Sequence, residues 1–219
     1  MVSGHGSFFM GIITAIEQQK RNPQRVNVYL DHCFAFGLAV EVAHGLHLGQ
    51  ELSAEQQSQL TSQELFWQAK EQAIHFLSFR PRSVDEVVRH LTAKGYDEAL
   101  TGRVIEHLKQ VQLVDDEAFA RYWVDQRESF KPRSQIALRY ELQKKGVSRP
   151  VIDEAVGQVD EEATAQTLAW QRSGRLAHLP YPEFRQKLGR YLQQRGFSYA
   201  TIEQVTQETW QSLRSEEKQ

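Results

Sequence analysis

The tetrapeptide Lys94-Gly95-Tyr96-Asp97 recurs in this chain as Lys145-Gly146-Val147-Ser148 and again as Arg195-Gly196-Phe197-Ser198. The glycines of the three copies are 51 and 50 residues apart. A cation followed by glycine is typical of a helix end, because glycine adopts a left-handed backbone easily and the helix dipole favours a positive charge there. The Asp or Ser that closes each copy is a good N-cap. Each copy therefore predicts that one helix ends and another begins.

Two other features recur at the same spacing. Prolines stand 14 residues before the three glycines, at Pro81, Pro132 and Pro182. Pairs of aliphatic residues four apart, which share one face of a helix, lie between them at Val87/Leu91, Leu138/Leu142 and Leu188/Leu192. Features that repeat in step indicate a duplicated unit, and a period of this size is typical of stacked helical arrays. We expect a mainly α fold, a tandem array of three three-helix repeats forming an elongated, curved body. Such an array offers a long binding surface rather than a deep pocket.

The N-terminal part has the pattern of β-strands instead. Residues 12–19 and 25–31 alternate between apolar and polar side chains around turn-forming Asn22-Pro23, and residues 34–38 form a third short run. We expect a small antiparallel sheet of three strands, with residues 49–52 as a connection. A sheet of this size is marginal alone, so it should pack on a helix. The sequence leaves open whether the sheet also contacts a partner, and we expect it to cover the first helices.

These patterns divide the chain into six segments. They are a disordered start at 1–9, a three-stranded β extension at 10–52, a linker helix with the first repeat at 53–114, the second repeat at 115–159, the third repeat at 160–212 and a frayed tail at 213–219. Capping boxes, in which a serine is followed three residues later by Glu or Gln, place helix starts at Ser53 and Ser83. Asp115 and Asp160 are the N-caps expected for the first helices of the second and third repeats.

Charge is segregated along the chain although the net charge is only −2. Residues 127–149 carry seven Lys/Arg against two Glu, and residues 172–195 carry six against one. Acidic residues collect at 115–117 and 160–162. One interpretation is ordinary solvated helix faces. The other is a basic stripe that meets an acidic partner or a nucleic-acid backbone.

No combination of residues that supports catalysis is visible, and we expect no enzyme. Nucleophile, base and stabiliser do not assemble, there is no glycine-rich phosphate loop, and we expect neither a cofactor nor a metal. His44 and His47 have a ligand-like spacing but no third ligand nearby in the sequence. The lone Cys33 excludes an intrachain disulfide, which fits a cytoplasmic location. No apolar run is long enough to span a membrane and no signal peptide is visible.

Several of these stretches together resemble one family. The run from Phe76 to Val87, Phe-Leu-Ser-Phe-Arg-Pro-Arg-Ser-Val-Asp-Glu-Val, is followed by Leu91 and the first Lys-Gly-aromatic stop. Then come Asp115-Asp116-Glu117-Ala118-Phe119-Ala120 and Tyr140-Glu141-Leu142-Gln143-Lys144-Lys145-Gly146-Val147. This series is similar to the signature of RecX regulatory proteins over nearly the whole chain. Two departures are Val87, where the family usually has leucine, and Lys131-Pro132, where it often has glycine.

The resemblance implies a modulator of the RecA recombinase. Such a protein binds RecA, lies along the groove of its filament on single-stranded DNA, suppresses ATP hydrolysis and strand exchange, and limits filament growth. We expect a cytoplasmic monomer that contacts single-stranded DNA directly or through the filament. The residues expected to bind the filament or DNA are exposed cations, namely Arg80, Arg82, Arg89, Lys131, Arg133, Arg139, Lys144, Arg185, Arg190 and Arg195.

Two alternatives remain open. The short glycine turn between helices favours a direct, helix-turn-helix-like DNA-binding protein. Against this reading, the helix after each turn carries acids where a recognition helix would present Arg, Asn or Gln, for example Asp153 and Glu203. The other alternative is a scaffold for a different acidic protein.

Overall fold

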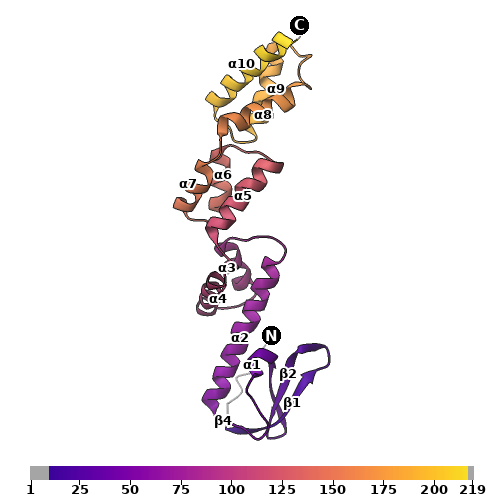
Figure 1. The fold of residues 1–219 in the computed structure, drawn as a ribbon, viewed down its shortest axis with the longest axis vertical. Helices are drawn as coiled ribbons and strands as arrows, with labels where there is room; N and C mark the ends of the chain where they lie inside the picture. The colour runs from indigo at the N-terminus through magenta and orange to yellow at the C-terminus, as the bar shows by residue number, and fades with distance from the viewer. Residues whose placement is uncertain (1–9, 217–219) are drawn as a thin grey trace. The chain divides into compact units, whose positions relative to one another are not determined.

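A computed structural model describes residues 10–216 and contains ten helices and four strands in that range (Figure 1). The disordered start that we expected at 1–9, and the last three residues of the expected tail, lie outside the described residues. The chain forms two compact units. Among the described residues, the first comprises 10–79 and 90–111, and the second comprises 80–89 and 112–216.

The first unit begins with an antiparallel sheet of four strands in the order β3-β2-β1-β4. The strands are β1 (Gly11–Gln19), β2 (Asn22–Leu30), β3 (Cys33–Ala39) and β4 (Glu51–Leu52). The expectation of three strands was therefore wrong by one. The residues that we assigned to a connection include β4, which pairs with the start of β1. A two-residue strand is too short to produce an alternating pattern in the sequence.

Asn22-Pro23 is also part of a strand and not of the turn, contrary to the sequence analysis. The turn is made by Lys20 and Arg21, and Asn22 pairs with Gln19. Proline is tolerated at position 23 because the pairing of β2 with β3 begins only at Arg25. Pro23 also lies next to a shift in the register between β1 and β2. A backbone N–H is not needed at such a position.

The sheet packs on the first long helix. After the single turn of α1 (Val40–Ala43), α2 (Ala54–Leu77) begins at the capping box that the sequence predicted between Ser53 and Gln56. Ile13, Val28, Leu38 and Leu52 form the buried core of this region, and Leu60 of α2 packs against it. The sheet thus covers α2.

A buried carboxylate on α2 joins the sheet to the helix. Glu64 accepts a hydrogen bond from the Ala39 backbone N–H at 2.7 Å and forms an ion pair with Arg25 at 2.6 Å. Gln68 donates to the same carboxylate at 2.6 Å. The Glu64 side chain is only 7% exposed. Because a buried charge is costly without partners, these three contacts fix the position of the sheet on α2.

The first repeat uses the C-terminal part of α2 as its first helix, followed by α3 (Val84–Ala93) and α4 (Glu98–Gln110). The unit boundary falls inside α3. Asp97 caps α4, as the sequence predicted, by accepting from the Leu100 N–H at 2.8 Å. Contacts of α4 with α2 include Phe66 and His107, whose rings lie 5.8 Å apart. The buried face of α4 consists of Thr101, Val104, Ile105 and Leu108.

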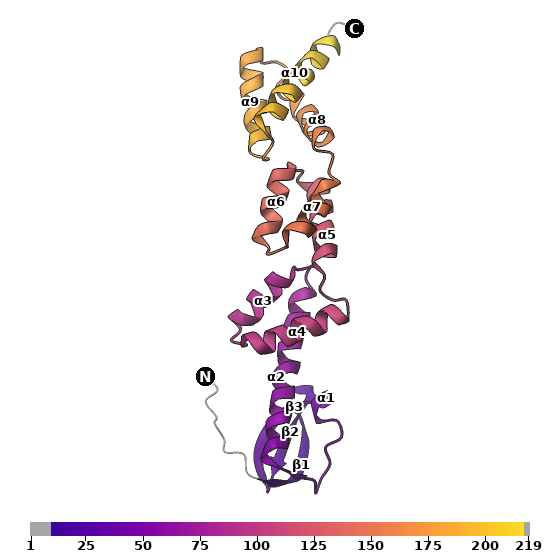
Figure 2. The same ribbon diagram turned by 90° about the vertical axis from the view of Figure 1, so that its left-hand side faces the viewer.

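The second unit contains the other two repeats. The second repeat consists of α5 (Asp116–Phe130), α6 (Gln135–Lys144) and α7 (Arg149–Gly157), and the third of α8 (Glu161–Ser173), α9 (Tyr181–Gln193) and α10 (Tyr199–Glu216). Asp115 and Asp160 cap α5 and α8 as predicted. Each repeat has its own core. The middle helices α6 and α9 lie on the same side of this unit (Figure 2).

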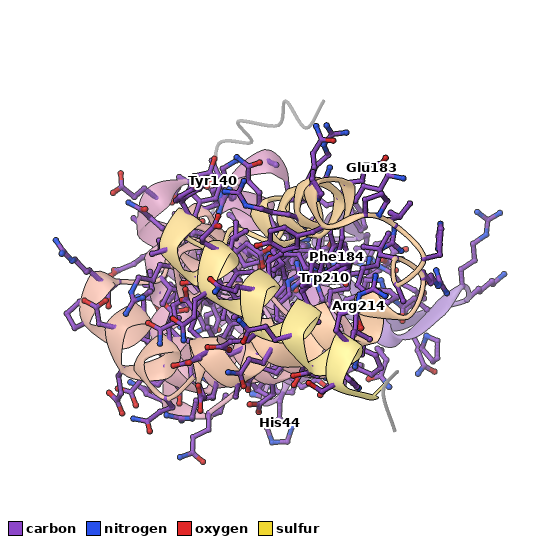
Figure 3. All side chains as sticks on the ribbon, turned by 90° about the horizontal axis from the view of Figure 1, so that it is seen from above. His44, Tyr140, Glu183, Phe184, Trp210 and Arg214 are labelled. Carbon is purple, nitrogen blue, oxygen red and sulfur yellow. The ribbon has the colours of Figure 1, made fainter. Side chains whose placement is uncertain are left out.

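The expected frayed tail is in fact helical as far as Glu216. Trp210 packs against buried Phe184, with ring centroids 5.0 Å apart (Figure 3), and Leu213 joins the same core. These two residues of α10 are three apart and so share one face of the helix. Burial of that face stabilises the last turns, which their charged neighbours had obscured in the sequence.

The repeat signals have the structural meaning that their chemistry predicts. All six aliphatic residues of the three pairs are fully buried. The three glycines have positive φ, at 91° for Gly95, 75° for Gly146 and 92° for Gly196. The prediction of a mainly helical protein with three three-helix repeats and an N-terminal antiparallel sheet is therefore confirmed.

Candidate partner-binding surface and repeat junctions

Serine side chains join consecutive repeats in the second unit. The Ser134 hydroxyl at the start of α6 donates to the Gly196 carbonyl at 2.7 Å, and its N–H donates to the Arg195 carbonyl at 3.1 Å. At the equivalent position 51 residues earlier, the Ser83 hydroxyl at the start of α3 donates to the Lys145 carbonyl at 2.5 Å. Both serines also cap their own helices. In both cases a serine hydroxyl therefore donates to a main-chain carbonyl of the next repeat's Lys/Arg-Gly motif, at the glycine for Ser134 and at the preceding lysine for Ser83.

The third repeat lacks this serine. Its equivalent of Arg133-Ser134 is Glu183-Phe184, counted from Pro132 and Pro182. Phe184 is fully buried in the third core, where it packs against Trp210. In the first two repeats this position contacts the next repeat, whereas in the third repeat it packs within the repeat's own core.

We call the contact between the first and second repeats the first junction and the contact between the second and third repeats the second junction. Glycine is required at both for two reasons. Besides the positive φ, a Cβ atom on Gly146 would overlap the Asp85 side chain. A Cβ atom on Gly196 would lie 2.7 Å from Ser134 Oγ and 2.8 Å from Ala137 Cβ. At Gly95, by contrast, nothing lies within 4 Å of the added atom. The later two glycines thus allow close approach of the preceding repeat as well as ending a helix.

A half-buried carboxylate organises the first junction. Glu86 accepts from Arg80 at 2.7 Å and 3.2 Å, from Lys145 at 3.2 Å and from the Ser83 N–H at 3.3 Å. The bonds to Ser83 complete the predicted capping box. Burial favours the neutral acid, but these hydrogen bonds outweigh it and hold the pKa of Glu86 at about 2. The carboxylate therefore stays ionised and joins α3 to the end of α6.

The predicted arginines of the first repeat all contact this junction. Arg80 pairs with Glu86, and Arg82 lies 4.0 Å from the same carboxylate with a side chain that is 17% exposed. Arg89 forms an ion pair with Asp85 and donates to the Lys144 carbonyl at 3.2 Å. These side chains have structural partners, which the sequence pattern did not reveal.

Two further predicted cations take part in the second junction. Arg133 donates to the Gln194 carbonyl at 2.8 Å and lies 3.8 Å from Glu141. Arg195 packs over the Tyr191 ring at 4.5 Å and donates to the Pro132 carbonyl at 3.5 Å. Each of them therefore makes one contact within its own repeat and one to the neighbouring repeat.

Two more predicted arginines pair within their own repeats. Arg139 donates to Asp153 at 3.2 Å and to Gln135 at 3.0 Å. Arg185 makes a forked pair with Glu203, at 2.6 Å for its shortest contact. The hydrogen bonds from Arg185 lower the pKa of the Glu203 carboxyl. In both pairs an acid of the following helix neutralises the arginine.

The remaining three predicted cations lie at the surface. Lys131, Lys144 and Arg190 are exposed, and none of them pairs with a carboxylate of residues 10–215. The Lys144 ammonium lies over the Tyr140 ring at 4.6 Å. These three cations are the part of the predicted set that is open to a partner.

Exposed apolar residues that were not predicted from the sequence lie near these cations. Ile136, Tyr140 and Lys144 are spaced four apart on α6, and we call them the α6 stripe. Ile136 is 62% and Tyr140 57% exposed. Phe130, which precedes Lys131, is 75% exposed. The four-residue spacing of the stripe is visible in the sequence. Leu138 and Leu142 have the same spacing but lie on the opposite, buried face, so spacing alone does not show which face is exposed.

The described part of the chain offers neither a metal site nor a membrane span. Residues 10–216 contain no group of three or more His, Cys, Asp or Glu side chains that could hold a metal ion. None of the helices in that range combines the length and the apolar character that crossing a bilayer requires.

The fold and its surface define a class, a protein of tandem three-helix repeats whose exposed features are suited to binding. Models of the RecX family match the chain in order: the regulatory protein RecX N-terminal domain at residues 11–53 and the first, second and third RecX three-helix domains at 69–108, 115–156 and 160–206. The chain belongs to the RecX family.

Individual relatives agree with this assignment. The chain is 32% identical to the regulatory protein RecX of Clostridioides difficile, over 90% of this chain and 94% of that one. It is 31% identical to the regulatory protein RecX of Halalkalibacterium halodurans, over 94% and 84%. A crystal structure of a regulatory protein RecX superimposes with a TM-score of 0.72 at 27% identity, covering 90% of this chain and 99% of that chain. The family consists of regulatory proteins, as expected from a sequence without a catalytic set.

Proposed function

We propose that this protein regulates the RecA recombinase by binding RecA and its filament on single-stranded DNA. Binding inhibits ATP hydrolysis and strand exchange and limits filament growth. The observation that carries the proposal is the match of all four RecX domains in order along residues 11–206. RecA as the target, and inhibition as the effect, are what the resemblance to RecX regulatory proteins implies.

The surface of the second unit supports a role in binding. Lys131, Lys144 and Arg190 are exposed positive charges without a carboxylate partner among residues 10–215, and Tyr140 is an exposed aromatic residue beside Lys144. A cation next to an aromatic ring suits both a protein interface and a nucleic-acid strand. We propose that these four residues make the direct contacts.

The other seven predicted cations then act indirectly. By joining repeats or neutralising nearby acids, they fix the spacing of the exposed groups, and a repetitive partner requires such a fixed spacing. Reversing their charge would disturb folding as well as binding, so they are poor probes of the interface. We further propose that the protein acts as a monomer in the cytoplasm and meets single-stranded DNA directly or through the filament.

The test is the ATPase activity of a bacterial RecA on single-stranded DNA with the purified protein added in increasing amounts. We expect inhibition that saturates at or below one molecule per RecA monomer. A parallel measurement follows RecA filament length by electron microscopy, where we expect shorter filaments. Unchanged ATPase activity at stoichiometric amounts would reject the proposal.

Direct DNA binding without RecA is the alternative, and two contacts argue against it. Arg139 and Arg185 would be needed for phosphate or base contacts, but they pair with Asp153 and Glu203 of the following helices. Those acids would repel a DNA backbone. Nanomolar, sequence-specific binding to bare DNA near physiological salt would nevertheless favour this alternative over the regulator.

A further inference from the structure

We propose that a groove between α5 and α7 of the second repeat binds a helical segment of another protein that carries basic side chains around an apolar stripe. The groove has a volume of about 370 Å³. Its lining comes from these two helices and the residues that directly follow α7. It is separate from the cations that we assign to the RecA surface, since none of Lys131, Lys144 and Arg190 lines it.

The floor of the groove is apolar. Val124 and Val159 belong to the core of the second repeat and are 4% and 5% exposed. Val151 and Ala155 are half-buried and pack against that core from α7. An apolar floor of this kind gains free energy when a partner's side chains remove it from water.

The rim is acidic. Glu117, Asp125, Glu128 and Glu154 line it, and the one cation in the lining, Arg121, lies 4.0 Å from Glu117. Asp125, Glu128 and Glu154 form no ion pair with any part of the chain that the structure describes, and all three are exposed. Uncompensated negative charges around an apolar floor attract a positively charged partner and repel nucleic acid.

The spacing of the lining residues favours a helix as the occupant. The α5 residues at 117, 121, 124, 125 and 128 share one face of that helix, and the α7 residues at 151, 154 and 155 share one face of the other, which Gln158 at the C-cap of α7 extends. Two helices that present such faces form a groove into which the side-chain ridge of a third helix packs. An amphipathic helix in an apolar groove is a common mode of recognition.

The third repeat does not share the acidic rim. The groove between α8 and α10 of the third repeat contains one acid, Glu208. Its lining is Gln166, Thr167, Trp170, Gln171, Glu208, Thr209 and Ser212. The negative charge around the groove is therefore not a consequence of the repeat fold alone. This difference supports a separate role for the groove of the second repeat.

The experiment titrates the full-length protein into a fluorescein-labelled helical peptide that has leucines along one face and lysines elsewhere, and follows fluorescence anisotropy. We expect the triple variant Asp125→Asn, Glu128→Gln, Glu154→Gln to raise Kd at least about tenfold. The matched control neutralises three exposed acids of the first unit, Glu17→Gln, Glu71→Gln and Glu98→Gln, and we expect a change of less than about twofold.

A second peptide tests the floor. It keeps every lysine but carries serine in place of leucine, and we expect it to bind at least about fivefold more weakly. In the protein, Ala155→Gln fills the groove without changing its charge and should weaken binding of the leucine peptide similarly. A thermal unfolding curve shows whether this variant is folded, and the surface triple variant remains decisive if it is not.

Three results would overturn the proposal. In the first, the native protein does not bind the leucine peptide. In the second, it binds the leucine and serine peptides equally well. In the third, the groove and control variants lose the same affinity for the leucine peptide. Sedimentation equilibrium of the native protein and the groove variant measures self-association, and so tests whether a second copy of this chain occupies the groove. Self-association that disappears in the groove variant would replace the proposed partner with another copy of the protein.

Discussion

The hydroxyl of Ser134 donates a hydrogen bond to the main-chain carbonyl of Gly196, 62 residues further along the chain, at 2.7 Å. The same hydroxyl accepts from the Ala137 N–H at 3.1 Å and so caps α6. One fully buried side chain therefore satisfies the start of one helix and the end of another. Such a residue cannot be exchanged without affecting both helices.

Replacing this serine should destabilise the protein. Ser134→Ala removes the cap and leaves the Gly196 carbonyl without its donor, so we expect a loss of about 1–3 kcal/mol in the free energy of unfolding, measured by urea denaturation. Ser148→Ala is the matched control, because Ser148 occupies an N-cap position but makes no side-chain capping bond. The control should lose less than about 0.5 kcal/mol.

The junction glycines should be less tolerant than the glycine of the first repeat. Gly95→Ala incurs only the left-handed backbone penalty of about 1 kcal/mol. Gly146→Ala adds overlap with the Asp85 side chain, so we expect a clearly larger loss of unfolding free energy. Thermal unfolding of the two variants provides the comparison. Equal losses would mean that the junction opens to accept the methyl group.

Acid should weaken the first junction. The pKa of Glu86 falls from an ordinary 4.5 to about 2 in the folded protein. Because the unfolded chain then binds a proton more readily, the contribution of Glu86 is complete above about pH 5 and is lost as pH falls toward about 2. Glu86→Gln should reduce stability at pH 7 and flatten its decline between pH 6 and pH 3. Glu71→Gln, at an exposed carboxylate of α2, should keep the native pH dependence.

The sheet should loosen when its buried anchor is removed. Glu64→Ala leaves the Arg25 guanidinium and the Ala39 N–H without their shared acceptor. We expect a loss of about 3–5 kcal/mol, as for other half-broken buried ion pairs, and faster proteolysis within residues 10–52. Limited proteolysis followed by mass spectrometry locates the cuts. Cleavage confined to the third repeat would contradict this role of Glu64.

The exposed cations should matter for RecA inhibition. The triple variant Lys131→Glu, Lys144→Glu, Arg190→Glu should need at least about tenfold more protein for half-maximal inhibition of the RecA ATPase, with an unchanged circular dichroism spectrum. Lys20→Glu with Arg21→Glu, at the exposed hairpin turn of the sheet, is the control. If both variants inhibit like the native protein, the interface lies elsewhere on the chain.

Local chemistry made most of the helix boundaries predictable. The capping box at Ser53, the caps Asp97, Asp115 and Asp160, and the positive φ of Gly95 depend on residues within one helical turn of each other. The repeat signal added the number of units. By contrast, β4 pairs with residues about 40 positions away and is only two residues long, so no local pattern reveals it.

The binding surface was less predictable because the sequence does not show which charges meet. Arg89 donates to the Lys144 carbonyl 55 residues away, and Arg133 donates to the Gln194 carbonyl 61 residues away. The sequence does not reveal these partners because they are main-chain carbonyls, which every residue carries. Arg89 keeps an exposed side chain despite its contacts, as Lys131 and Arg190 do, so the fold rather than the composition decides which cations have partners.

The replacement of the junction serine by Phe184 in the third repeat limits how such a protein can evolve. A gene that copied the third repeat would gain a unit without the hydroxyl that its new neighbour needs. Copying the second repeat would instead supply Arg133 and Ser134 again, and the inserted unit could dock on both sides. Lineages with longer arrays should therefore descend from internal duplication.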